Sequence, residues 1–132
     1  MSAFRRNKYN VSPKQERTVD GVVFDSKWEC KAYLLLKSML GKDSFELSPV
    51  YELQPSFKFG SKTIRAIKYI GDFLIKYNGE EYVVDTKGME TDVFKIKEKM
   101  FKHKFDKEII KLKRASQLVD FVETIKRNDK KI

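Results

Sequence analysis

The sequence predicts an α/β fold, in which a mixed β-sheet is flanked by helices, and three observations support it. Helical and β-rich segments follow one another in the order helix, several strands, helix, strand, helix, without internal repeats. Two β-rich runs are joined by Asn78-Gly79, a strong short-range signal for a hairpin because a type I′ turn needs positive φ at both positions. The 132 residues, 41% of them hydrophobic, are enough for one domain with a real core.

The composition narrows the range of partners and compartments. Lys and Arg number 28 against 19 Asp and Glu, a net charge of +9, which favours a nucleic acid partner over a merely soluble basic surface. A single cysteine and a single histidine argue against a disulfide framework and against zinc chemistry. Neither an apolar run of about 20 residues nor a signal-peptide pattern occurs, so we expect a cytoplasmic protein with no membrane partner.

The N-terminal part divides into an arm and the start of the domain. Residues 1–17 are basic and poor in large apolar groups, so we expect a flexible arm followed by a single domain over residues 18–132. Arg5 and Arg6 are candidate DNA contacts in this arm, although an inert tail is an equal alternative. Asp20-Gly21 predicts a small hairpin ahead of the first helix.

The first helix is expected from Ser26, which can cap it, to about Leu40, with Gly41 ending it. Glu29 is its unusual residue, because it stands at the start of the apolar stripe of this helix. Two interpretations stay open. Glu29 is either a first-turn acid favoured by the helix dipole or a third carboxylate of a metal site.

Strand material broken by prolines follows over residues 45–59, and residues 63–77 are long enough for two connected extended pieces. By alternation we place Tyr69 on the same face as Phe73, with Asp72 on the opposite face.

A second helix over residues 90–105, a strand over 107–113 and a terminal helix from Ala115 complete the chain. In the second helix we expect Val93, Ile96, Met100 and Phe101 to face inward. Four lysines are candidate phosphate contacts, against the alternative of solvated surface residues: Lys68, Lys95, Lys99 and Lys102.

The Asn78-Gly79 turn sets a register that creates a candidate active site. If Tyr77 faces Glu80, then Asp72 faces Asp85, and two carboxylates with Cβ atoms about 5 Å apart should repel each other. Replacing either acid by Asn should then slightly stabilise the metal-free protein. Lys87 shares the face of Asp85, so the pattern predicts a divalent-metal site with an attached cation.

At these residues the sequence resembles the PD-(D/E)XK nuclease superfamily over roughly residues 22–112. The signature is an acid on one strand and (D/E)-X-K on the next, here Asp72 and Asp85-Thr86-Lys87, often with an acid from the preceding helix, here Glu29. The runs FDSKWE, YELQPSF, YIGDF and VVDTKG are similar to those of small phage-encoded members. Gly71 stands where the signature has proline, and Asp85 where Glu is more usual.

The resemblance implies a restriction-endonuclease-like core and a Mg²⁺-dependent DNA endonuclease, with Mn²⁺ able to substitute. It implies that Asp72, Asp85 and the Thr86 backbone carbonyl are metal ligands and that Lys87 lies near the attacking water. Relatives of this size include Holliday-junction resolvases, which work as homodimers, so a branched-DNA resolvase is the favoured expectation. The alternatives are a nicking, repair or transposon-end nuclease of the same fold, and a non-catalytic nucleic-acid-binding module.

Overall fold

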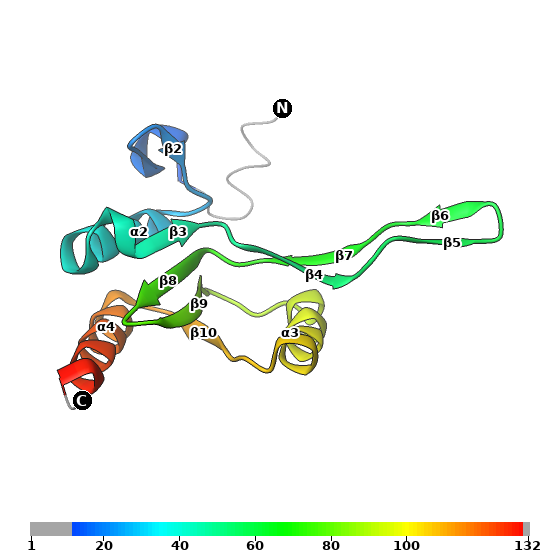
Figure 1. Cartoon of the computed structure of the whole chain (residues 1–132). Helices are drawn as coiled ribbons and strands as arrows, with labels where there is room; N and C mark the ends of the chain where they lie inside the picture. The colour runs from blue at the N-terminus through cyan, green and yellow to red at the C-terminus, as the bar shows by residue number, and fades with distance from the viewer. Residues whose placement is uncertain (1–11, 131–132) are drawn as a thin grey trace. The chain divides into compact units, whose positions relative to one another are not determined.

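The computed structural model describes residues 12–130, which fall into two compact units (Figure 1). The first unit contains residues 12–42 and 114–130, and the second contains residues 43–113. Their placement relative to one another is not determined. Together they contain helices and strands in the expected order, and the protein is a mixed α/β protein.

The first unit pairs two helices and adds a small hairpin. Its elements are η1 (Lys14–Arg17), β1 (Thr18–Val19), β2 (Val22–Val23), α2 (Lys27–Leu40) and α4 (Ala115–Lys130). Helix α2 packs against α4, and Leu36, Leu118 and Val122 are completely buried. The expected cap is confirmed, because the Ser26 Oγ accepts a hydrogen bond from the Glu29 N–H, and Gly41 follows the helix at a φ of 89°.

The end of the expected basic arm is a folded element. Arg5 and Arg6 lie outside the described residues, so their assignment stays a prediction. Within η1, however, the Arg17 side chain is buried and donates hydrogen bonds to the carbonyls of Ser12 (2.9 Å) and Phe24 (2.5 Å). Arg17 therefore contributes to the structure of the first unit rather than to a mobile surface.

The second unit contains the mixed sheet that the sequence predicts, with the strand order β10-β9-β8-β3. Its strands are β3 (Phe45–Leu47), β8 (Phe73–Tyr77), β9 (Glu80–Thr86) and β10 (Ile109–Leu112). Strand β8 is antiparallel to both of its neighbours, β3 and β9, and β10 is parallel to β9. The hairpin register is confirmed, because Tyr77 faces Glu80 and the turn residues have φ values of 52° and 82°.

A two-stranded ribbon extends from this sheet within the same unit (Figure 1). Its inner part pairs β4 (Val50–Gln54) with β7 (Ile67–Ile70), and its outer part pairs β5 (Phe57–Phe59) with β6 (Lys62–Ile64). A short 3-10 helix, η2 (Lys42–Ser44), precedes β3.

Helix α3 (Asp92–Phe105) packs against the inner ribbon with a face that differs from the expected one. Phe94 and Phe101 are buried, whereas Val93 and Ile96 are 61% and 60% exposed. The prediction for Val93 and Ile96 was wrong because the helix turns a different face to the ribbon. The aromatic rings of Phe94 and Phe101 lie on that face and pack against Tyr69.

Tyr69 also lies on another face than expected. It belongs to one buried cluster with Leu74 and Val83, not with Phe73. The chain is not in strand conformation at Gly71 and Asp72, between β7 and β8. This interruption shifts the alternation by one residue, so a strict two-residue period across it assigns the wrong face.

Along residues 12–130, none of the helices combines the length and the apolar character that crossing a lipid bilayer requires.

Candidate active site

The end of the β8–β9 hairpin brings Asp72 and Asp85 together, and each binds the backbone of the other's strand. The Asp72 N–H donates to Asp85 Oδ1 (2.9 Å). In return, Asp72 Oδ2 accepts hydrogen bonds from the N–H and the hydroxyl of Thr86, both at 2.8 Å. The two acids are therefore interlocked through main-chain donors, which fixes their positions more firmly than the strand pairing alone.

Asp85 is the most deeply buried carboxylate of this site, with only 2% of the residue exposed. Besides the Asp72 N–H, its carboxylate accepts hydrogen bonds from the Tyr69 hydroxyl (2.6 Å) and lies 3.1 Å from the Lys87 Nζ, both at Oδ2. Burying a carboxylate is costly unless donors and an opposite charge compensate it. Here three donors surround the carboxylate, and we expect them to offset both the desolvation and the repulsion between the two acids.

Tyr69 is a site residue that sequence reasoning missed. Burial, and then the negative charge of Asp85 beside it, raise the pKa of the Tyr69 hydroxyl far above its ordinary value. The hydroxyl is thus a permanent donor that orients Asp85. Gly71 is closely packed beside this contact, because a Cβ at that position would lie only 3.1 Å from Val83 and 3.3 Å from Pro49.

Lys87 lies between the Asp85 carboxylate and the aromatic ring of Phe94. Its Nζ lies 3.8 Å from the centroid of the Phe94 ring, a distance typical of a cation–π contact, and its side chain is 20% exposed. The Lys87 ammonium group therefore lies beside the Asp85 carboxylate, while part of the side chain reaches solvent.

A cavity of about 270 Å³ adjoins Lys87 and is basic in character. Its polar lining includes Lys68, Lys87, Lys97 and Thr91, and no acidic side chain lines it. Lys68 was predicted as a phosphate contact and does line this cavity, whereas Lys97 was missed. Lysines around a concave surface are suited to a phosphate group.

The remaining predicted lysines lie elsewhere on α3. Lys95, Lys99 and Lys102 are exposed and do not line the cavity. Lys102 pairs with Glu108 at 3.1 Å, an exposed ion pair of the kind that contributes little to stability. Their role in binding DNA stays a prediction.

Glu29 belongs to the first unit, where it lies in the first turn of α2, as expected, and takes part in capping the helix. Its Oε1 accepts a hydrogen bond from the Asp25 N–H (3.0 Å), while its own N–H donates to Ser26 Oγ (3.0 Å). This reciprocal arrangement closely resembles a capping box. Its role as a metal ligand stays a prediction.

The paired acids offer a metal ion oxygen ligands. Within residues 43–113, Asp72 and Asp85 are not joined by a further Asp, Glu, His or Cys into a group of three potential ligands. Two carboxylates together with a backbone carbonyl, such as that of Thr86, are nevertheless sufficient for Mg²⁺, which prefers oxygen and retains several waters. The donor set therefore fits a hard divalent cation and does not fit zinc.

The second unit of this mixed α/β protein therefore places two interlocked acids and a lysine beside a cavity lined by three lysines. The chain belongs to the DUF1064 family, described as a protein of unknown function, whose model matches residues 6–120. No curated protein and no solved structure matches the chain.

Proposed function

We propose that this protein is a Mg²⁺-dependent DNA endonuclease of the PD-(D/E)XK superfamily. The observation that carries the proposal is the interlocked pair Asp72 and Asp85, with Lys87 held between Asp85 and a cavity lined by three lysines. The fold is consistent with it. Helix α2, the antiparallel pair β8–β9, helix α3 and strand β10 follow one another in the order that a restriction-endonuclease-like core requires.

Each residue of the site has a distinct role in this proposal. Asp72, Asp85 and the Thr86 carbonyl would hold Mg²⁺, or Mn²⁺ in its place. When bound, the metal ion supplies polarisation of a phosphoryl oxygen and a lowered pKa of coordinated water. Lys87 orients the attacking water and stabilises negative charge that develops on the phosphate. Tyr69 holds Asp85 in position through its hydroxyl.

The cavity beside Lys87 suits the phosphate backbone of the substrate. Lys68 and Lys97 add two positive charges to that of Lys87 on its wall. Three cations around one concave site neutralise adjacent phosphates and would make binding strongly dependent on salt. The net charge of the whole chain, +9, also favours a nucleic acid partner.

Branched DNA, such as a four-way junction cut by a homodimer, is the favoured substrate class, because two symmetric cuts need two sites. A nicking, repair or transposon-end nuclease keeps the same chemistry with another substrate. A non-catalytic binding module is the competing class, but it gives no reason for burying a carboxylate within reach of Tyr69 and Lys87.

The test is a cleavage assay with labelled four-way junction, flap, linear duplex and single-stranded DNA in Mg²⁺. The wild-type protein should cut at least one of them, and EDTA should stop the reaction. Asp72→Asn should lose cleavage and keep DNA binding, while the exposed Asp120→Asn serves as a matched carboxylate control and should behave as wild type. Absence of cleavage with both Mg²⁺ and Mn²⁺, or an active Asp72→Asn protein, would contradict the proposal.

A further inference from the structure

The outer part of the ribbon exposes apolar side chains that do not belong to the buried cluster around Tyr69 and Phe101. Phe59 is 76% exposed, Phe57 44% and Ile64 38%. Every residue from 55 to 65 is exposed. A two-stranded hairpin alone is marginal in water, and clustered apolar exposure marks an interaction site.

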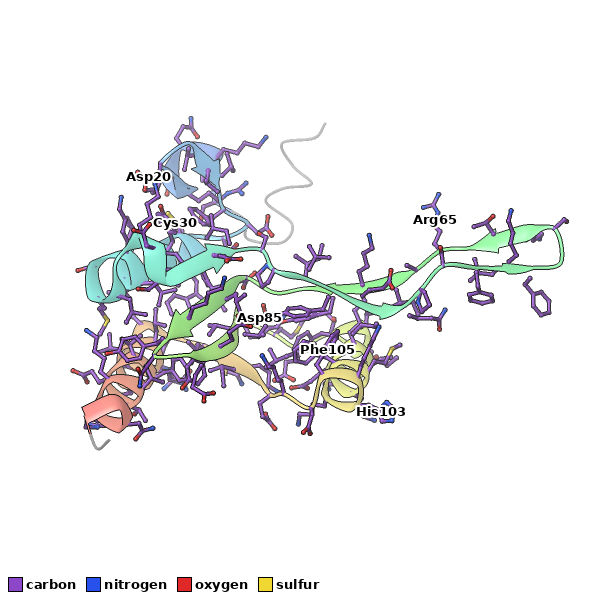
Figure 2. The ribbon with its side chains drawn as sticks, viewed as in Figure 1. Asp20, Cys30, Arg65, Asp85, His103 and Phe105 are labelled. Atoms are coloured by element: carbon purple, nitrogen blue, oxygen red, sulfur yellow. The ribbon has the colours of Figure 1, made fainter. Side chains whose placement is uncertain are left out.

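The two faces of the outer ribbon differ in chemistry. The register places Phe57 opposite Ile64 and Phe59 opposite Lys62, so that these four share one face. Lys58 faces Thr63 on the other side. Figure 2 labels Arg65, whose side chain extends away from the ribbon at the base of the outer part.

The charge of the ribbon selects the partner. From Pro55 to Lys68 the chain carries four cations, Lys58, Lys62, Arg65 and Lys68, and no acid. A second copy of the same ribbon in a two-fold contact would bring these cations against their own kind. A polyanion is complementary to them, and a two-stranded β-ribbon has the width that a DNA groove admits.

We propose that the outer ribbon, residues 55–65, binds DNA where base stacking is interrupted. Phe57 and Phe59 stack on exposed bases, and Lys58, Lys62 and Arg65 contact the flanking phosphates. Base pairs next to a branch are already partly unstacked, so inserting an aromatic ring there costs less than in continuous duplex. This inference rests on the proposed function only in taking DNA as the substrate, since ribbon binding needs no cleavage.

Binding is measured by fluorescence anisotropy at about 150 mM salt, with Mg²⁺ replaced by EDTA, using a branched DNA and a linear duplex of equal length. Phe57→Ala/Phe59→Ala should weaken binding to branched DNA on the order of ten-fold or more, with a smaller effect on linear duplex. Lys58→Gln/Lys62→Gln should weaken both DNAs and lower the slope of log K against log salt by about 2. Ile96→Ala, an equally exposed apolar residue on α3, is the matched control and should bind as wild type.

The outcomes separate the ribbon from the nuclease. Unchanged binding and cleavage of branched DNA by the Phe double variant would overturn the ribbon inference and leave the nuclease proposal intact. Ribbon-dependent binding by a wild-type protein that cuts nothing would support the inference and refute the nuclease. A wild-type dimer in light scattering that the Phe substitutions convert to monomer, without loss of DNA affinity, would assign the ribbon to a second copy instead.

Discussion

Replacing Asp85 by asparagine tests whether donors or repulsion dominate at the paired acids. From the sequence, facing carboxylates should repel, so removal of one charge should stabilise the metal-free protein. The structure reverses this expectation for Asp85, because its carboxylate accepts hydrogen bonds from the Asp72 N–H and the Tyr69 hydroxyl and pairs with Lys87. An asparagine in the same place has one acceptor oxygen and an NH₂ group.

The magnitude follows from the bonds that asparagine cannot make. Its Oδ1 can still accept from the Asp72 N–H, which leaves the NH₂ group facing two donors, the Tyr69 hydroxyl and the Lys87 ammonium. A hydrogen bond to a charged group contributes about 1.5–3 kcal/mol, and a buried donor without a partner costs a similar amount. With Lys87 still 20% exposed to water, we expect a loss of about 2–4 kcal/mol in the free energy of unfolding.

The assay is urea unfolding in EDTA, with the midpoint and the m-value fitted for each protein. A loss of this size lowers Tm by roughly 10 °C for a chain of this length. Glu46→Gln is the matched control, because Glu46 pairs with Lys76 at the surface and its loss should leave stability near wild type. An Asp85→Asn protein as stable as wild type, at unchanged m-value, would show that repulsion between the acids cancels the donors.

Three further outcomes follow from the same contacts. Lys87→Ala should retain metal binding, measured by calorimetry, yet lose most of the cleavage rate, and Lys87→Arg should not restore it because the wider guanidinium does not match the ammonium position. Glu29→Gln retains an oxygen that can accept from the Asp25 N–H, so it should lower the free energy of unfolding by less than about 1 kcal/mol. A ten-fold or greater loss of cleavage rate in this variant would assign Glu29 to the metal site. Full activity would assign it to the helix alone. Because the pKa of Tyr69 is raised, the folded state retains the hydroxyl proton above pH 10 while the unfolded state releases it, so the free energy of unfolding falls as pH rises beyond 10. Tyr69→Phe should make that decline shallower by up to about 1.4 kcal/mol per pH unit. An unchanged slope, measured by urea unfolding at several pH values, would contradict the assignment.

Local signals in the sequence were sufficient for the hairpin and the helix ends. The Asn78-Gly79 turn and the Ser26 cap each act over a few residues, so their chemistry alone determines the register of β8–β9 and the start of α2. Continuing that register by one residue beyond the Phe73–Val84 pair brings Asp72 beside Asp85, which is why the contact between the two acids was predictable.

Features that depend on breaks and on packing between elements were not predictable. Tyr69 reaches Asp85 only because the strand is interrupted at Gly71, and nothing in the apolar pattern marks a shift of one residue there. The orientation of α3 depends on which of its apolar residues pack into the core, and Phe94 and Phe101 are buried there instead of Val93 and Ile96. This orientation also places Lys97 on the wall of the cavity. The only local hint of the interruption was Gly71, which stands directly before the first acid, Asp72, where the signature has proline.

Because Asp72 and Asp85 are interlocked, the geometry of the site depends on the pairing of β8 with β9. Each acid is held by a backbone N–H on the opposite strand, so neither position persists once the hairpin opens. The loop that must close between the two acids is short, and its entropy cost is correspondingly small. The site should therefore assemble and dissolve as a unit with the hairpin, so that a chain still unfolded, or one whose hairpin has opened, carries no competent site. Hydrogen exchange at the Asp72 and Thr86 amides would report this opening directly.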